Sequence, residues 1–254
     1  VNSGLCAALK NYFQSNENYK LKCESINNMT SKKIEFENAE NAKNLFSKNI
    51  TLSASQIEKY YDCAFEYFCK YVLNAKPRKR AEFGNLEYGN VMHYVLEKLL
   101  KKYPDKKLTL TKSEEIKKSI SEITNNYVDN KLGGIKNKNA KFLYLVNRLK
   151  KTVYFLANHF IEEFKQSSFI VSDLELEISS NGKIKPLCFT LSDKTNVKVE
   201  GKIDRVDVMK TKTENYVRVI DYKTSNKSFK LSDLLSGMNM QMLIYLITLQ
   251  KSEY

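Results

Sequence analysis

The sequence lacks the features that mark membrane and secreted proteins. No apolar run approaches the roughly 20 residues that a membrane-spanning helix requires. The opening stretch, VNSGLCAALKNYFQ, has no basic start followed by a long apolar core, so it does not resemble a signal peptide. The five cysteines are scattered and odd in number, which argues against a disulfide framework. We therefore expect a protein of the reducing cytoplasm that does not enter a membrane.

The chain also lacks the glycine-rich Walker A pattern of nucleotide-driven motors. Any ATP-driven motor is therefore expected elsewhere in a longer protein or in a partner subunit. Two features indicate such a longer protein. The sequence begins with Val1 in place of Met, and it stops on an amphipathic stretch, MLIYLITLQKSEY.

Acidic residues are outnumbered by basic ones. The chain has 42 Lys and Arg against 29 Asp and Glu, which gives a formal net charge of +13. This balance favours a polyanionic partner, with nucleic acid first and an anionic membrane surface second. A solvated lysine-rich surface would give the same charge, so charge alone leaves the partner open.

Two parts of the chain differ in pattern. Residues 1–50 are polar and weakly patterned, and we interpret them as a preceding segment with some helix. Helical spacing begins at Ser53, which forms a capping box with Gln56, and continues to about residue 72. Further helices are predicted over 86–103, 112–131, 139–166 and 231–250. The basic loop KPRKR (76–80) lies between the first two.

The period then changes from 3.6 to 2, which predicts strands over 169–178, 187–191, 197–210 and 216–224. Helices followed by a small meander and a closing helix indicate an α+β fold, with a small mixed α/β core and a largely helical cap. The domain is expected to span residues 51–254.

The last two strands are predicted to form a hairpin around TKTE (211–214). Symmetric pairing places Asp207 opposite Arg218 and Asp204 opposite Asp221. Two facing carboxylates, with Cβ atoms roughly 4.5–5.5 Å apart, repel unless a cation lies between them. Mg²⁺, which prefers hard oxygen ligands, meets that demand. A solvated charged strand end has the same spacing, so the metal site is a hypothesis at this point.

Six pieces of sequence, in order, resemble a known family. They are SASQIEKYYDCAFEYFCKYVL, YGNVMH, LELEI, GKIDRVD, VIDYKT and GMNMQMLIYL. Together, over about residues 51–250, they are similar to the PD-(D/E)xK nuclease superfamily, and within it to the RecB-like branch found in AddB-type subunits of helicase–nucleases.

The resemblance implies a restriction-endonuclease-like core and a Mg²⁺- or Mn²⁺-dependent DNA exonuclease of double-strand break repair and recombination. It also implies single-stranded DNA as substrate, held by its backbone, and an AddA-type partner subunit. Two other functions remain open: a catalytically inactive DNA-binding module with the same fold, and an acidic hairpin that binds phosphate-bearing small molecules.

The resemblance also implies roles for individual residues. The expected metal ligands are His93, Asp204, Asp221, the Tyr222 carbonyl and, less directly, Glu175. Lys223 is expected to orient the nucleophile, and Gln241 and Tyr245 to position the substrate strand or the site. The residues themselves leave alternatives. A lone histidine at a helix edge is usually a core-edge residue, Asp173 and Glu177 share the face of Glu175, and Gln241 with Tyr245 fits an ordinary polar helix edge.

Cys63 matches a cysteine that, in AddB-type members, holds a [4Fe–4S] cluster together with three later cysteines. Such a cluster needs about four thiolates, and the chain ends before any such trio. We therefore expect the cluster only in a longer protein, and little or no activity from this fragment alone. A small buried apolar residue is the alternative interpretation of Cys63.

Overall fold

The computed structural model describes residues 4–28, 49–75, 83–136, 138–224, 230–252 and 254, in two compact units, 1–47 and 48–254. The first unit contains α1 (Gly4–Ser15) and α2 (Glu17–Asn28), which are the helices expected in this segment. The predicted basic loop at 76–80 lies outside the described residues. Over the part that is described, no helix is long and apolar enough to cross a membrane.

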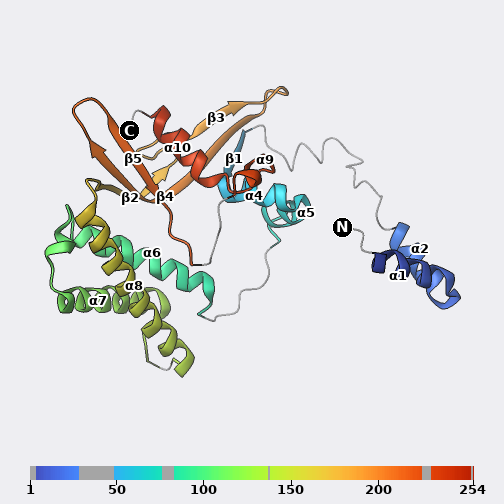
Figure 1. Cartoon of the computed structure of the whole chain (residues 1–254), viewed down its shortest axis with the longest axis horizontal. Coiled ribbons are helices and arrows are strands. Elements are labelled where there is room, and N and C mark those ends of the chain that lie inside the picture. Colours follow the sequence, from blue (N-terminus) through green and yellow to red (C-terminus); the bar gives the residue numbers. More distant parts are fainter. Residues whose placement is uncertain (1–3, 29–48, 76–82, 137, 225–229, 253) are drawn as a thin grey trace. The chain divides into compact units, whose positions relative to one another are not determined.

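The second unit is built on a five-stranded sheet whose central strand is β4 (Asn196–Lys210). Along its second half, β4 pairs antiparallel with β2 (Ile170–Ile178) on one side and with β5 (Asn215–Ile220) on the other. Along its first half it pairs with β3 (Leu187–Thr190) and β1 (Asn49–Ser53) (Figure 1). The predicted α+β class with a small central sheet is confirmed.

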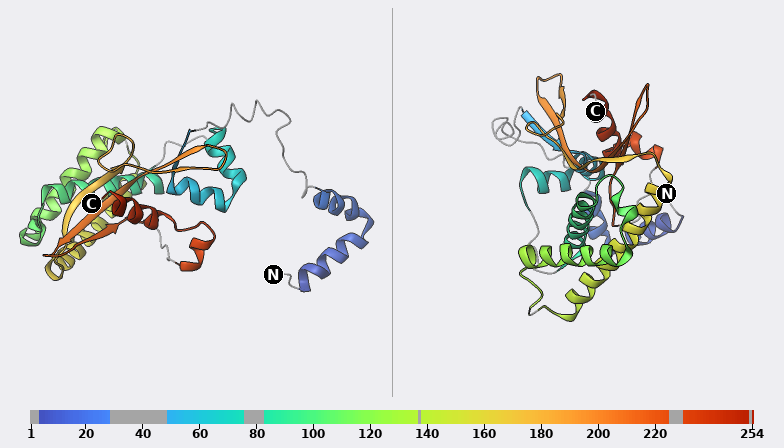
Figure 2. Two further views of the ribbon diagram at one scale, coloured as in Figure 1. Left: turned by 90° about the horizontal axis from the view of Figure 1, so that it is seen from above. Right: turned by 90° about the vertical axis from the view of Figure 1, so that its left-hand side faces the viewer.

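Three helices form one layer beside the sheet: α6 (Asn85–Lys102), α7 (Ser113–Leu132) and α8 (Ala140–Gln166). Figure 1 and the right-hand view of Figure 2 both place this layer below the strands. Its core consists of side chains that are almost fully buried: Val95, Leu96, Leu99, Leu149, Val153 and Ala157. A second core joins the sheet to α4 (Ala54–Asp62) and α10 (Gln241–Lys251) and contains Ala54, Ile203, Val206, Ile244 and Leu249.

The predicted hairpin register is confirmed over six pairs, from Arg205 with Ile220 to Lys210 with Asn215. Asp207 lies opposite Arg218, as the sequence predicts. The prediction of a strand through residue 224 is wrong, because β5 ends at Ile220. Asp221 therefore leaves the sheet, and it forms no ladder pair with Asp204.

Two predicted helices are interrupted. The first begins as predicted, with Ser53 Oγ accepting from Gln56 N and Gln56 Oε1 accepting from Ser53 N, but it breaks at Cys63, whose backbone is extended. Beyond the break lie α5 (Ala64–Tyr67) and a π-helical turn over Phe68–Val72. The closing helix is divided into α9 (Leu231–Leu235) and α10, because Gly237 adopts φ +73° between them. A side chain at Gly237 would also collide with the ring of Tyr61.

Candidate active site

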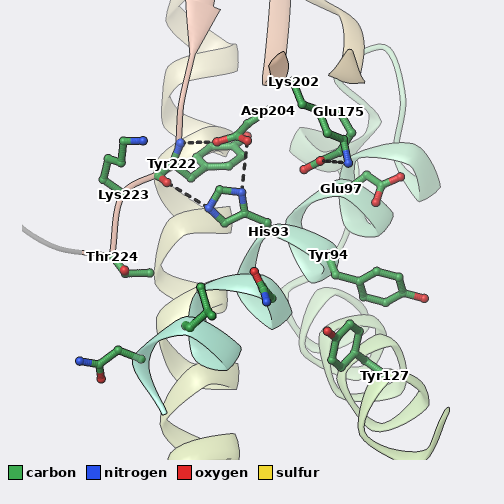
Figure 3. A pocket seen from close by; sticks show the side chains of 14 residues that line it. His93, Tyr94, Glu97, Tyr127, Glu175, Lys202, Asp204, Tyr222, Lys223 and Thr224 are labelled. Atoms are coloured by element: carbon green, nitrogen blue, oxygen red, sulfur yellow. Dashed lines mark hydrogen bonds and ion pairs between the residues drawn. The ribbon is translucent and has the colours of Figure 1, made fainter. Parts of the chain in front are cut away.

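A pocket of about 790 Å³ opens between α6, β2, β4 and the segment that follows β5 (Figure 3). We call it the site pocket. Charged side chains from all four segments line it: His93, Glu97, Glu175, Lys202, Asp204 and Lys223. Segments more than 100 residues apart in sequence thus meet at one concave surface, which is where binding sites usually lie.

Three of these side chains form a compact group, which we call the His–Glu–Asp trio. One ligand atom each from His93, Glu175 and Asp204 lie within 4.8 Å of one another. His93 Nδ1 is 3.2 Å from Asp204 Oδ1, and Asp204 is 8% exposed. An imidazole nitrogen with two carboxylate oxygens is a donor set that fits a divalent cation such as Mg²⁺ or Mn²⁺.

The backbone of Tyr222 orients two members of this trio. Its N–H donates to Asp204 Oδ2 at 2.7 Å, and its carbonyl lies 3.0 Å from His93 Nε2. A carbonyl only accepts, so Nε2 carries a proton and Nδ1 is the nitrogen that faces Asp204. The hydrogen bond to Asp204 raises the pKa of the His93 imidazole, and burial opposes the rise. The Tyr222 oxygen is thus engaged by His93, and its expected role as a metal ligand stays a prediction.

Glu175, a member of the trio, has an unusual backbone conformation. Its φ is +54°, in the left-handed region that residues other than glycine rarely adopt. Its neighbours Leu174 and Leu176 keep regular pairing with β4. Lys202 Nζ lies 2.6 Å from Glu175 Oε2, and this hydrogen bond raises the pKa of Lys202.

The other acidic side chains of β2 lie elsewhere. Asp173 pairs with Lys183 at 2.8 Å, and Glu177 is exposed. Among the three candidates that sequence alone did not separate, the structure therefore brings Glu175 to the site pocket.

Asp221, Lys223, Gln241 and Tyr245 form a second group, which we call the Asp221 cluster. Lys223 Nζ is 2.6 Å from Asp221 Oδ2, and Gln241 Nε2 donates to Asp221 Oδ1 at 2.9 Å. Gln241 Oε1 accepts from Lys223 at 3.1 Å. Gln241 thus holds the Asp221 carboxylate and the Lys223 ammonium in one arrangement. The backbone of Tyr222, which lies between these two residues, connects this cluster to the trio.

Tyr245 anchors the Asp221 cluster to β4. Its hydroxyl donates to the Lys202 carbonyl at 2.9 Å and accepts from Gln241 Nε2 at 3.1 Å. Burial raises the pKa of this hydroxyl. The ring lies over Gly201, where an added Cβ would come within 2.9 Å of Tyr245 Cε1.

We expect Gly201→Ala to lower the free energy of unfolding by about 1–3 kcal/mol, because the buried Tyr245 ring has to move. Gly89→Ala is the matched control. An added Cβ there lies 3.7 Å from Thr224, an ordinary contact, and alanine favours the helix by up to about 1 kcal/mol. Denaturant unfolding of both variants measures the difference. Equal stability of the two would contradict the packing of Tyr245 on β4.

A buried ionic cluster, not predicted from the sequence, lies behind the site. Arg205 is fully buried and donates to both oxygens of Asp207, at 2.7 and 2.6 Å. Its guanidinium stacks on Phe160 and Phe164 of α8, 5.0 and 4.8 Å from the ring centroids. The Phe160 ring in turn packs against the ring of Tyr222. This cluster therefore supports the residue whose backbone orients His93 and Asp204.

The structure places Cys63 at the break between α4 and α5. Its side chain is exposed, and its sulfur accepts from Glu66 N at 3.4 Å at the start of α5. The alternative of a small buried apolar residue is therefore wrong. The metal-ligating group found among the described residues contains no cysteine, and the iron–sulfur role stays a prediction.

Comparisons with known proteins agree with this geometry. The PD-(D/E)XK nuclease superfamily matches residues 51–254. The chain is 36% identical over 218 residues, 84% of its length, to a subunit of the ATP-dependent helicase/deoxyribonuclease of Caldanaerobacter subterraneus. It is 29% identical over 222 residues, 87% of its length, to the subunit of the same name in Clostridium acetobutylicum. The matches cover only 18% and 19% of those relatives. The chain belongs to the PD-(D/E)XK nuclease superfamily.

Proposed function

We propose that this chain is the nuclease domain of a longer helicase/deoxyribonuclease subunit, and that it hydrolyses phosphodiester bonds of single-stranded DNA with Mg²⁺ or Mn²⁺. The observation that carries the proposal is the His–Glu–Asp trio in the site pocket, with Lys223 of the Asp221 cluster at the edge of that pocket. The relatives are named as subunits of a deoxyribonuclease, which supports DNA as the substrate. From the family resemblance we also propose that the domain acts as an exonuclease in double-strand break repair, together with an AddA-type partner subunit.

The trio, His93, Glu175 and Asp204, would hold the cation, and Asp221 lies in the neighbouring cluster. When bound, such a cation lowers the pKa of a coordinated water and offsets negative charge on the reacting phosphate. The ammonium of Lys202 contacts Glu175 at 2.6 Å, so a cation competes with this lysine for the carboxylate.

The other polar groups of the site hold charged side chains in place. Lys223 presents an ammonium at the edge of the site pocket, where it orients the attacking water or a phosphate oxygen. Its contacts with Asp221 and Gln241 restrict it to one region. Asp204 is held by the Tyr222 N–H, which fixes one of its oxygens and leaves the other toward His93. The presence of Asp204, Asp221 and Lys223 together argues against an inactive DNA-binding module.

A cleavage assay with end-labelled single-stranded and duplex DNA tests the proposal. With the chain at micromolar concentration, we expect single-stranded DNA to be cut in Mg²⁺ or Mn²⁺ and to stay intact in EDTA. The high protein concentration allows for the weak activity expected of a fragment. Cleavage that persists in EDTA would refute the metal dependence. DNA binding without cleavage under every cation would support the inactive module instead.

A further inference from the structure

We propose that a second pocket beside the site pocket binds one nucleotide of single-stranded DNA, with the base against an apolar wall and a phosphate on Arg148. We call it the nucleotide pocket. It has a volume of about 760 Å³ and lies between the start of α6, α8 and residues 221–224. The inference rests on the proposed function and names how that site holds its substrate.

The two pockets are continuous in their lining. Asn85, Tyr222, Lys223 and Thr224 border both of them. Residues 222–224 therefore form a ridge, with the His–Glu–Asp trio on one side and Arg148 on the other. When one phosphate of a DNA strand lies at the trio and the strand crosses this ridge, an adjoining nucleotide of the same DNA strand lies at the nucleotide pocket.

One wall of the nucleotide pocket is apolar and held in place. It is formed by Phe83, Tyr88, Met92, Leu145 and Leu156. The Phe83 ring packs edge-on against Tyr88 and Phe142, with centroids 6.5 and 5.2 Å away. The Tyr88 hydroxyl donates to Thr152 Oγ1 at 3.1 Å, which links α6 to α8. A preformed apolar wall suits the flat face of a base, and such contacts tolerate any sequence.

The charge of the nucleotide pocket favours an anion. Arg148 is exposed and has no carboxylate partner among the described residues, whereas Arg205 and Arg218 both pair with Asp207. The one carboxylate in the lining, Asp221, is already bound by Lys223. The site pocket, by contrast, contains Glu97, Glu175 and Asp204. A cation therefore fits one side of the ridge, and a phosphate fits the guanidinium on the other.

The first test removes the positive charge of Arg148. Fluorescence anisotropy of the chain with labelled oligo(dT) in EDTA measures Kd over a series of salt concentrations. We expect Arg148→Gln to weaken binding about fivefold and to lower the slope of log Kd against log salt by about 0.7, the loss of one phosphate contact. Lys151→Gln removes an equal charge from an exposed position of α8 and is expected to change Kd less than twofold.

The second test removes part of the apolar wall. An oligonucleotide of the same length made only of abasic sites has the backbone without bases, and we expect it to bind the wild-type chain about tenfold more weakly than oligo(dT). Leu156→Ala is expected to lower the ratio of the two Kd values, abasic oligonucleotide over oligo(dT). Phe155→Ala, at an exposed neighbouring position, is expected to leave this ratio unchanged. Arg148→Gln weakens both ligands equally. If Leu156→Ala unfolds the chain, Leu145→Ala replaces it.

These outcomes separate the inference from the proposed function, because neither test requires cleavage. Binding with these signatures by a chain that cuts no DNA would keep the nucleotide pocket and would support the inactive DNA-binding module over the nuclease. The nucleotide pocket proposal would be overturned if the chain cuts DNA but Arg148→Gln and Lys151→Gln have equal Kd. It would also be overturned if Leu156→Ala leaves the ratio of the Kd for the abasic oligonucleotide to that for oligo(dT) unchanged. Absence of any oligo(dT) binding would overturn it as well.

Discussion

Asp204→Asn is expected to remove divalent-cation binding and to lower the rate of DNA cleavage by at least about 100-fold. Even outer-shell partners of metal ligands typically cost about 10–100-fold when they are lost. The amide keeps the shape of the carboxylate, and its oxygen still accepts from Tyr222 N–H, but the negative charge toward His93 is gone. Isothermal titration with Mn²⁺ measures the affinity for the cation independently of cleavage.

Two further variants test whether the loss of cation binding is specific to the trio. Asp173→Asn removes a carboxylate of β2 that pairs with Lys183, outside the trio, and is expected to keep both cation binding and cleavage. Lys223→Met is expected to lose cleavage while it keeps the cation, because its ammonium contacts Asp221 and Gln241 and none of the trio. Wild-type Mn²⁺ affinity in Asp204→Asn would remove Asp204 from the metal site.

Local patterns predicted the parts of the fold that neighbouring residues determine. The turn at 211–214 and the alternation on both sides of it predicted the register of the β4–β5 hairpin, including Asp207 opposite Arg218. They did not predict β1, which pairs in parallel with a strand about 147 positions later, Asn49 with Asn196. No local turn signal exists for such a pair. Apolar spacing likewise missed the helix break at Cys63, and Tyr60 and Tyr61 just before it are exposed.

The residues of the candidate site were likewise predicted only in part from local sequence patterns. Strand alternation pointed to Asp204 and Asp221, but the predicted pairing of the two is wrong, since β5 ends one residue before Asp221. Glu175 was separated from the other two acidic residues of β2 by the pocket that it lines, which alternation does not encode. The positions of His93 and Gln241 came from resemblance to a family, because their partners are 129 and 20 residues away.

Arg205 was missed for a different physical reason. An arginine in an alternating strand resembles a solvent-facing residue, and lysine and arginine are rarely buried without a partner. Here the partner, Asp207, is two positions along the same strand, and both side chains are fully buried beneath α8. Burial lowers the pKa of Arg205, but the hydrogen bonds to Asp207 together with the charges of Asp207 and Glu163 leave that pKa raised.

Asp207→Ala is therefore expected to destabilise the fold by about 3–5 kcal/mol, which is the usual cost of leaving a buried charge without its partner. Arg205 would keep only Glu163, 3.7 Å away, as a carboxylate neighbour, and Arg218 would lose its bond to Asp207. Glu114→Gln breaks the exposed ion pair with Lys117 and is expected to cost less than about 0.5 kcal/mol. Urea unfolding of both variants measures the contrast.

The double variant Arg205→Met, Asp207→Leu distinguishes a buried charge from lost packing. Replacing both members of a buried ion pair with apolar groups of similar size is often close to neutral, so this protein is expected to recover most of the stability that Asp207→Ala loses. The methionine also keeps apolar contact with Phe160 and Phe164, which support Tyr222. If the double variant is as unstable as Asp207→Ala, packing and not the unpaired guanidinium is the source of the loss.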